Sequence, residues 1–295
     1  MKRGYKFFLL TGFACLAVGL VGSAISFKTL DLEAGIAKVD IEKKISAASI
    51  DTIIIQNDIS NITFVPTNGD EIKVRLSGTM REQNANECTV EAVTEGSNVW
   101  RVDVCTKEKD HFDIGFDITE FKNWIAGRGF GLKTEVSLPD KMYKAITVNS
   151  DTGGIALNDL KAEKLTVNTD TGNISLDRYE GKSMNLQTDT GSIHIQEGQG
   201  DAKLKTDTGS ITARMAEIGE SVSLESDTGS VRLTLDPVPK NVNFDLAADT
   251  GAVNLEVPGL TVDREDHHAA KGTLGDGSKK VKIRVDTGYI SVTGR

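Results

Sequence analysis

The sequence has few aromatic side chains, few prolines and no excess of basic residues. Among its 295 residues, Phe, Trp and Tyr together make up 5%, and there are 5 prolines and 3 cysteines but 29 glycines. The formal net charge is -9. Binding to nucleic-acid phosphates needs clustered Lys and Arg, so this composition excludes a nucleic-acid partner. Many glycines and few aromatics favour short strands joined by tight turns.

The N-terminal stretch has no charged residue between positions 7 and 27, and Lys2, Arg3 and Lys6 precede it. At ~1.5 Å per residue, a helix of this length spans roughly 31 Å, close to the thickness of a bilayer core. We therefore predict one transmembrane helix within residues 1–28, which contacts the membrane through residues 7–27. The basic end stays in the cytoplasm, so the C-terminal domain is extracytoplasmic. Two alternatives remain, namely signal cleavage near Gly22-Ser23-Ala24, which would secrete the domain, and lipid attachment at Cys15.

The two other cysteines, Cys88 and Cys105, flank two alternating stretches on either side of Gly96-Ser97. An antiparallel hairpin centred there places position 88 opposite position 105. Facing cysteines outside the cytoplasm indicate a disulfide. The alternative is a pair of buried free thiols, because unpaired cysteine is often a core residue.

An Asp-Thr-Gly triplet recurs at near-constant spacing, which is the signature of a repeat architecture. With each aspartate as position zero, positions -5, -3, +4 and +6 are apolar, as in Leu165, Val167, Ile174 and Leu176. A disguised eighth copy, Asp-Ile-Ser, centres on Asp58 with the same apolar offsets. The triplets begin at Asp151, Asp170, Asp189, Asp207, Asp227, Asp249 and Asp286.

The offsets predict a corner at each triplet. Spacing by two within each apolar pair is strand alternation, but seven positions separate -3 from +4, so only a bend lets both pairs face one interior. Glycine at +2 permits the bend, the aspartate is expected to cap it as an Asx-turn, and the Ser or Thr at -1 is expected to line its inside. The corner glycines are Gly153, Gly172, Gly191, Gly209, Gly229, Gly251 and Gly288.

These features predict an all-β fold, a parallel β-solenoid of ~19-residue rungs over residues 50–295, preceded by a linker over 29–49. An insertion, residues 65–145, holds the hairpin and an aromatic-rich segment with Phe121 and Trp124. That segment is either a cap over the open end of the solenoid or a surface that contacts a partner or the membrane. A second interruption, residues 259–278, is expected to be a solvated loop. Its adjacent His267 and His268 are not expected to bind a metal.

The Asp-Thr-Gly triplet also carries the catalytic aspartate of pepsin-like and retroviral proteases. Those enzymes need two carboxylates that share one proton, whereas solenoid corners hold the carboxylates ~4.8 Å apart and pointing outward. We therefore predict no enzyme, no catalytic residue and no cofactor. Neighbouring charges repel by roughly 0.9 kcal/mol in water. A less favoured alternative is that hard cations such as Ca²⁺ bind this row, Asp151, Asp170, Asp189, Asp207, Asp227 and Asp249.

From about residue 50 to the end, the chain resembles the bacterial β-strand-repeat family known as "putative adhesin" proteins. The resemblance rests on "VSLPDKMYKAITVNSDTGGIALNDLKAEKLTVNTDTGNISL" and on "KVKIRVDTGYISV". It implies a β-helix-like domain, often attached to a membrane segment, with no established catalytic residues. The resulting hypothesis is a non-enzymatic, membrane-anchored scaffold for an unknown envelope or surface protein, serving adhesion or envelope stress. A self-assembling filament and a cation-binding solenoid are the alternatives.

Overall fold

The computed structural model describes residues 36–85, 87–106 and 131–295. The segment predicted to span the membrane, together with Cys15, Phe121 and Trp124, lies outside the described residues. No helix within the described ranges has the length and apolar character needed to cross a membrane. Apart from the short helix α2 (Glu82–Ala85), the elements in these ranges are strands.

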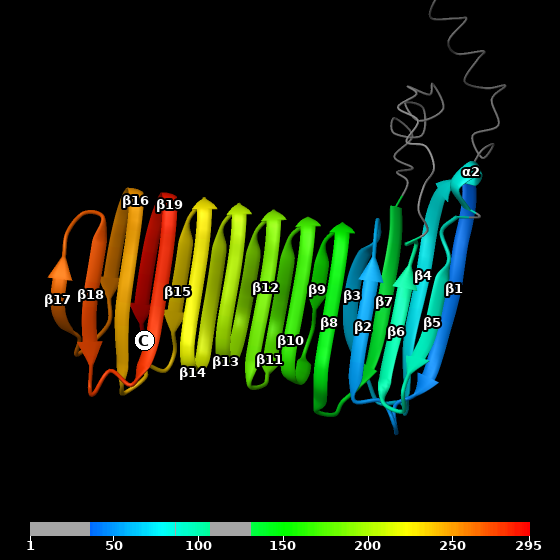
Figure 1. The fold of residues 1–295 in the computed structure, drawn as a ribbon, viewed down its shortest axis with the longest axis horizontal. Helices are drawn as coiled ribbons and strands as arrows, with labels where there is room; N and C mark the ends of the chain where they lie inside the picture. Colours follow the sequence, from blue (N-terminus) through cyan, green and yellow to red (C-terminus); the bar gives the residue numbers. More distant parts are fainter. Residues whose placement is uncertain (1–35, 86, 107–130) are drawn as a thin grey trace, which may run out of the picture. The chain divides into compact units, whose positions relative to one another are not determined.

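Most strands follow one another with short connections, whereas residues 105–130 separate β6 from β7 (Figure 1). They are β1 (Ile36–Ser46), β2 (Thr52–Asn57), β3 (Asn61–Thr67), β4 (Glu71–Arg81), β5 (Val90–Glu95), β6 (Val99–Val104), β7 (Gly131–Pro139), β8 (Tyr143–Thr152), β9 (Ile155–Leu157), β10 (Leu160–Thr171), β11 (Ile174–Glu180), β12 (Ser183–Thr190), β13 (Ile193–Thr208), β14 (Ile211–Thr228), β15 (Val231–Leu235), β16 (Val242–Glu256), β17 (Thr261–Glu265), β18 (Ala269–Leu274) and β19 (Lys279–Gly294).

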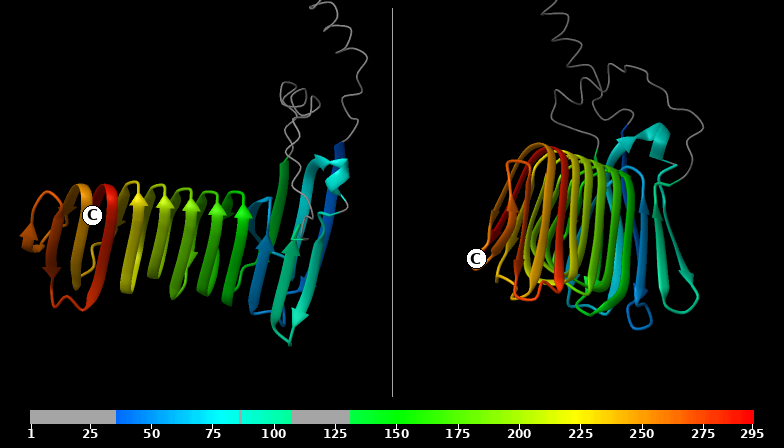
Figure 2. Two further views of the ribbon diagram at one scale, coloured as in Figure 1. Left: turned by 45° about the horizontal axis from the view of Figure 1, so that its top comes forward. Right: turned by 60° about the vertical axis from the view of Figure 1, so that its left-hand side comes forward.

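Successive rungs stack in parallel and form two faces. One face consists of the strand segments that precede the corners, in the order β6, β2, β8, β10, β12, β13 and β14. The other face consists of the segments that follow the corners, in the order β7, β3, β9, β11, β13, β14 and β15. The register aligns equivalent positions, for example Val148 with Val167 and Leu186. The parallel stack of short rungs that the repeat predicted is therefore present (Figures 1 and 2).

The apolar offsets form the core that the sequence predicted. Around Asp170 all four side chains are fully buried, and those around Asp58 are buried as well. Val253 and Leu255 are only half-buried. They lie in the second half of β16, where β19 covers one edge but β18 pairs only with the first half, over 242–247.

The corner glycines are in close contact with one another. A Cβ added to Gly191 would lie 2.0 Å from the carbonyl oxygen of Gly172, and one added to Gly229 would lie 1.8 Å from that of Gly209. Both glycines also have positive φ, +156° and +151°. Glycine is thus required by the approach of the neighbouring rung as well as by the backbone bend.

The hydroxyls at position -1 are buried inside the bend, as predicted, and most of them bind the neighbouring corner. The hydroxyl of Thr188 donates to the carbonyl of Gly172 at 2.9 Å, and those of Thr206 and Ser226 donate to the preceding corner at 2.8 and 3.0 Å. Thr169 is the exception, because its buried Oγ1 has no hydrogen-bond partner.

The last two rungs are stacked in the reverse of their order along the chain. β19, which carries Asp286, lies between β14 and β15 on one side and β16 on the other. The Gly288 corner therefore contacts Gly229, and Gly251 contacts Gly288. These two rungs also differ from the others at position -1, where Val285 and Ala248 replace the usual Ser or Thr.

Three segments differ from the sequence-based expectation. The expected linker, 29–49, contains β1, which pairs with β4. The insertion, 65–145, extends both faces of the stack. β6 pairs in parallel with β2 on one face, and β7 pairs in parallel with β3 on the other. β5 then pairs antiparallel with β6, and β4 pairs antiparallel with β7. The expected loop, 259–278, was wrong, because β17 and β18 form an antiparallel hairpin on the edge of β16 (Figure 2).

We expect Gly191→Ala to lower the free energy of unfolding by about 2–4 kcal/mol, because the new Cβ meets a backbone carbonyl and the positive φ is retained. Gly131→Ala is the matched control, since no atom of the described residues lies within 4 Å of its added Cβ. Chemical denaturation measures both variants. Equal losses would contradict a specific role for the corner contact.

We expect Thr188→Val to cost about 1 kcal/mol, because the carbonyl of Gly172 loses its hydroxyl donor. Thr169→Val should be neutral or stabilising, since it removes a buried hydroxyl that has no partner. Denaturation midpoints of the two variants give the comparison. The same loss at both positions would show that the hydrogen bond contributes nothing.

Candidate interaction surface

The aspartate and the following threonine of each triplet form two columns on the outer corner of the stack. Asp151, Asp170 and Asp189 are exposed, as are Asp249 and Asp286, while Asp207 and Asp227 are half-exposed. The threonines at +1 are exposed in every rung and pair in register from rung to rung, Thr152, Thr171, Thr190, Thr208, Thr228, Thr287 and Thr250. We call these the aspartate column and the threonine column.

The Asx-turn predicted for the aspartates is wrong. The carboxylates of Asp151, Asp170 and Asp189, all within the described chain, accept no hydrogen bond from the backbone. The corner N–H groups are used by the next rung instead, as when Gly191 donates to Thr208 at 2.9 Å and Ile193 donates to Ser210 at 3.0 Å. With those donors occupied, the carboxylates face solvent.

One aspartate of the column has an ion-pair partner within its own rung. The Lys205 ammonium lies 3.3 Å from Asp207 Oδ1, and this interaction raises the pKa of Lys205. An exposed pair of this kind contributes little to stability. The fold thus accounts for the glycine, the apolar offsets and the position -1 hydroxyls, but it makes little use of the aspartate and threonine columns.

The arrangement of carboxylates is unsuited to protease chemistry. Equivalent strands lie ~4.8 Å apart, and each carboxylate points outward from its own rung, so no pair is enclosed to share a proton. Within the ranges that the structure describes, no three His, Cys, Asp or Glu side chains gather closely enough to hold a metal ion. His267 and His268, with ring centroids 5.0 Å apart, are exposed and belong to no such group.

A shallow hollow near the connection between β9 and β10 contains charges that already pair with one another. Lys161 lies 2.8 Å from Asp140, and Arg178 lies 3.4 Å from Asp159. Because these four charges already pair with one another, they offer a ligand few unsatisfied groups. The hollow is therefore a weaker candidate than the two columns.

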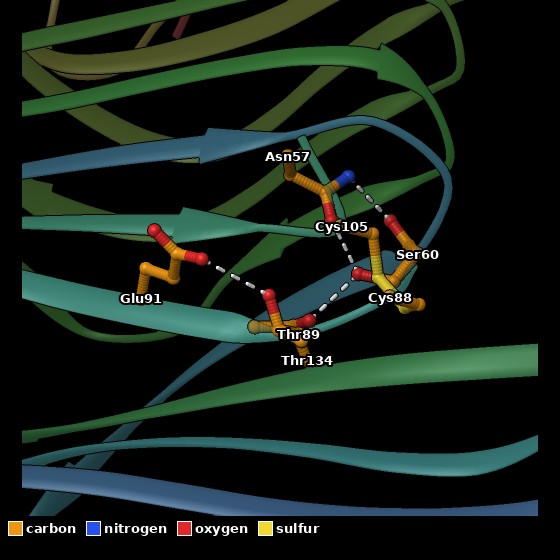
Figure 3. The surroundings of a disulfide bond; sticks show 7 residues. All are labelled: Asn57, Ser60, Cys88, Thr89, Glu91, Cys105 and Thr134. Atoms are coloured by element: carbon orange, nitrogen blue, oxygen red, sulfur yellow. Dashed lines mark hydrogen bonds between the residues drawn. A yellow bond between two sulfur atoms is a disulfide. The ribbon is translucent and has the colours of Figure 1, made fainter. Parts of the chain in front are cut away.

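At the N-terminal end of the stack, a disulfide joins Cys88 to Cys105 beside the β5–β6 hairpin (Figure 3). Both cysteines are buried, and the Cys105 N–H donates to the Thr89 carbonyl at 2.9 Å. The pairing register of the hairpin begins with Val90 opposite Val104. The bond therefore closes the open end of this hairpin.

A buried polar cluster lies beside the disulfide, at the corner of the Asp58 copy (Figure 3). Asn57 stands at position -1 and Ser60 at +2, in place of the usual hydroxyl and glycine. The Asn57 amide donates to Ser150 Oγ at 2.7 Å, and the Ser60 hydroxyl lies 2.6 Å from that of Thr134. Side-chain bonds thus link this disguised corner to the rungs on both sides.

Comparison with known proteins agrees with the resemblance seen in the sequence. The family model described as Toastrack DUF4097 matches residues 134–293, which is more than half of the chain and includes every Asp-Thr-Gly triplet. The match begins within β7 and leaves out β1 to β6. No curated protein matches the sequence.

Several solved structures align with this one at low identity. A putative adhesin from Bacteroides fragilis is 13% identical, with 87% of this chain and 98% of that chain covered and a TM-score of 0.43. A putative cell adhesion protein from Clostridium sporogenes is 10% identical, with 88% and 100% covered and a TM-score of 0.36. A putative lipid binding protein from Parabacteroides distasonis is 10% identical, with 87% and 95% covered and a TM-score of 0.25.

Reduction of the purified protein should raise its mass by about 2 Da, because each sulfur of the Cys88–Cys105 bond gains a hydrogen. With 17 residues of separation, loss of the bond should lower the free energy of unfolding by about 3 kcal/mol. Intact-mass measurement and denaturation, each with and without reductant, test this. An unchanged mass would favour free thiols instead.

Proposed function

The chain belongs to the Toastrack DUF4097 family, and on that premise we propose that its repeat domain is a non-enzymatic scaffold that binds another component of the cell envelope. The binding surface is the outer corner, where the aspartate and threonine columns run across successive rungs. The partner's matching surface presents hydrogen-bond donors and positive charge at intervals of one rung, ~4.8 Å.

The observation that carries the proposal is the repetition of residues that contribute little to the fold. Burial accounts for the apolar offsets, close contact for the glycines and hydrogen bonding for most hydroxyls at -1. The aspartates gain little from the fold, and like charges one rung apart repel one another. A surface that recurs at such a cost is best explained by recognition of a partner.

The proposal includes export and membrane anchoring. Support comes from the uncharged N-terminal segment behind Lys2, Arg3 and Lys6, and from the disulfide, since such bonds persist outside the cytoplasm. In the sequence, the proposed anchor at residues 7–27 precedes β1, which is the first described strand and pairs with β4.

The filament alternative has less support from the ends of the stack. End-to-end growth needs two matching parallel edges, whereas β17 is an antiparallel edge strand. Its charges also oppose pairing with another strand, as with Arg264, which lies 2.6 Å from Asp266. The cation-binding alternative lacks a coordinating cluster among the described residues.

The test applies a membrane-impermeant cross-linker to intact cells that carry the full chain, followed by capture of the chain. We expect one partner to be captured repeatedly, and capture to fall at least about tenfold in Asp170→Asn/Asp189→Asn, because the partner loses charge-assisted contacts. The stability of this variant should be unchanged or slightly raised, most clearly at low salt.

The matched control is Asp177→Asn/Glu197→Gln, which removes the same number of charges from the same two rungs but outside the columns. It should capture the partner as the unaltered chain does. Equal capture by both variants would overturn the assignment of the surface. An absence of any cross-linking from outside the cell would overturn export.

A further inference from the structure

β19 occupies a position in the stack that the chain reaches only at its very end. After β15 the chain leaves one strand position empty and forms β16 beyond it, then folds back through β17 and β18. β19 then enters the gap and pairs in parallel with β14 and β15 on one side and with β16 on the other. We call this gap between β14/β15 and β16 the slot.

The slot recognises a strand by shape and register as well as by backbone pairing. It buries five apolar side chains of β19 almost completely, Val281, Ile283, Val285, Ile290 and Val292. It also requires glycine at 288, where a Cβ would lie 1.8 Å from the carbonyl oxygen of Gly229. Its ligand class is therefore a β-strand with the Asp-Thr-Gly corner and the apolar offsets of a rung.

The connection between β18 and β19 crosses over the start of β16. Leu274 in β18 and Lys279 in β19 both pair with Val242, from opposite edges of β16, so the chain between them spans about two strand spacings, ~9.6 Å. Gly275 and Gly277 take left-handed φ values of +57° and +66°, and the Asp276 N–H donates to Asn241 Oδ1 at 3.3 Å. In proteins that exchange strands between copies, a short connection of this kind serves as the hinge.

We propose that the slot is a strand-acceptor site, and that β19 of a second copy of this chain enters it in trans when the chain's own β19 is prevented from doing so. Reciprocal exchange of residues 279–295 produces a dimer in which each slot is filled by the other chain's strand. The slot lies toward the end of the stack that is opposite β1, so the two copies join through these ends. This homotypic joining goes beyond the proposed scaffold function and does not depend on it.

The first test changes the hinge in the full chain. Deleting Asp276 and Gly277 leaves a connection that reaches at most about 10–11 Å when fully extended, too short to arch over β16 within one chain. We expect this variant to sediment as a dimer of twice the monomer mass, while the unaltered chain is a monomer. The control inserts two glycines after Gly277 and should remain monomeric. A folded, monomeric deletion variant would overturn the proposal.

The second test keeps the proposal falsifiable if the deletion variant does not fold. In full-length Ile283→Ser, the affinity of the chain's own β19 for the slot falls by roughly a hundredfold. A peptide of residues 279–295 at about 100 µM then competes with this weakened strand, whose effective concentration is in the mM range. We expect the labelled peptide to be retained at least about tenfold better than the same peptide carrying Gly288→Val, which cannot approach Gly229. Equal retention, or none, would overturn the acceptor site.

Discussion

The stack depends on the close approach of each corner glycine to a carbonyl oxygen in the neighbouring rung. A Cβ at the seven Asp-Thr-Gly corners would lie between 1.7 and 2.4 Å from that oxygen, so only glycine can occupy position +2 in those rungs. The contact fixes the register of every rung against the next, and the apolar offsets therefore align in continuous buried columns. The same carbonyl accepts the hydroxyl at position -1 in most regular rungs. One triplet thus sets the bend, the spacing and the alignment of the core.

Once packing has accounted for the glycine and its surroundings, the aspartate and threonine of the triplet remain. They face solvent in two columns, and the column carboxylates receive none of the backbone hydrogen bonds that would hold a capping residue. Their recurrence is thus better explained by what the surface contacts than by the stability of the fold. A flat array with one carboxylate per rung suits an extended partner surface and is poorly suited to enclosing a small substrate.

The apolar offsets were sufficient to predict the corners, the rungs and the disguised copy at Asp58, because alternation and the odd spacing leave one geometry that buries both pairs. The order of the last rungs could not be predicted, since Asp249 and Asp286 have equivalent offsets and either rung fits either place. Only Ala248 and Val285, which lack the usual hydroxyl, signal a change there. The strands β1 and β17 were not predicted, because they are rich in charged residues. They join the stack through backbone pairing at an edge, which requires few buried side chains and so leaves little hydrophobic pattern in the sequence. The Asx-turn failed because the next rung had already taken the corner donors.

Native-state hydrogen exchange tests the arrangement of the stacked rungs most directly, because it reports which rung lies inside the stack. Residues 291–293 of β19 have a paired neighbour on both edges, whereas their partners in β16, residues 254–256, are paired on one edge only. The amides of 291–293 should therefore exchange more slowly than those of 254–256. A stack that followed the order of the chain would place β19 outermost, and faster exchange over 291–293 than over 254–256 would contradict the arrangement described here.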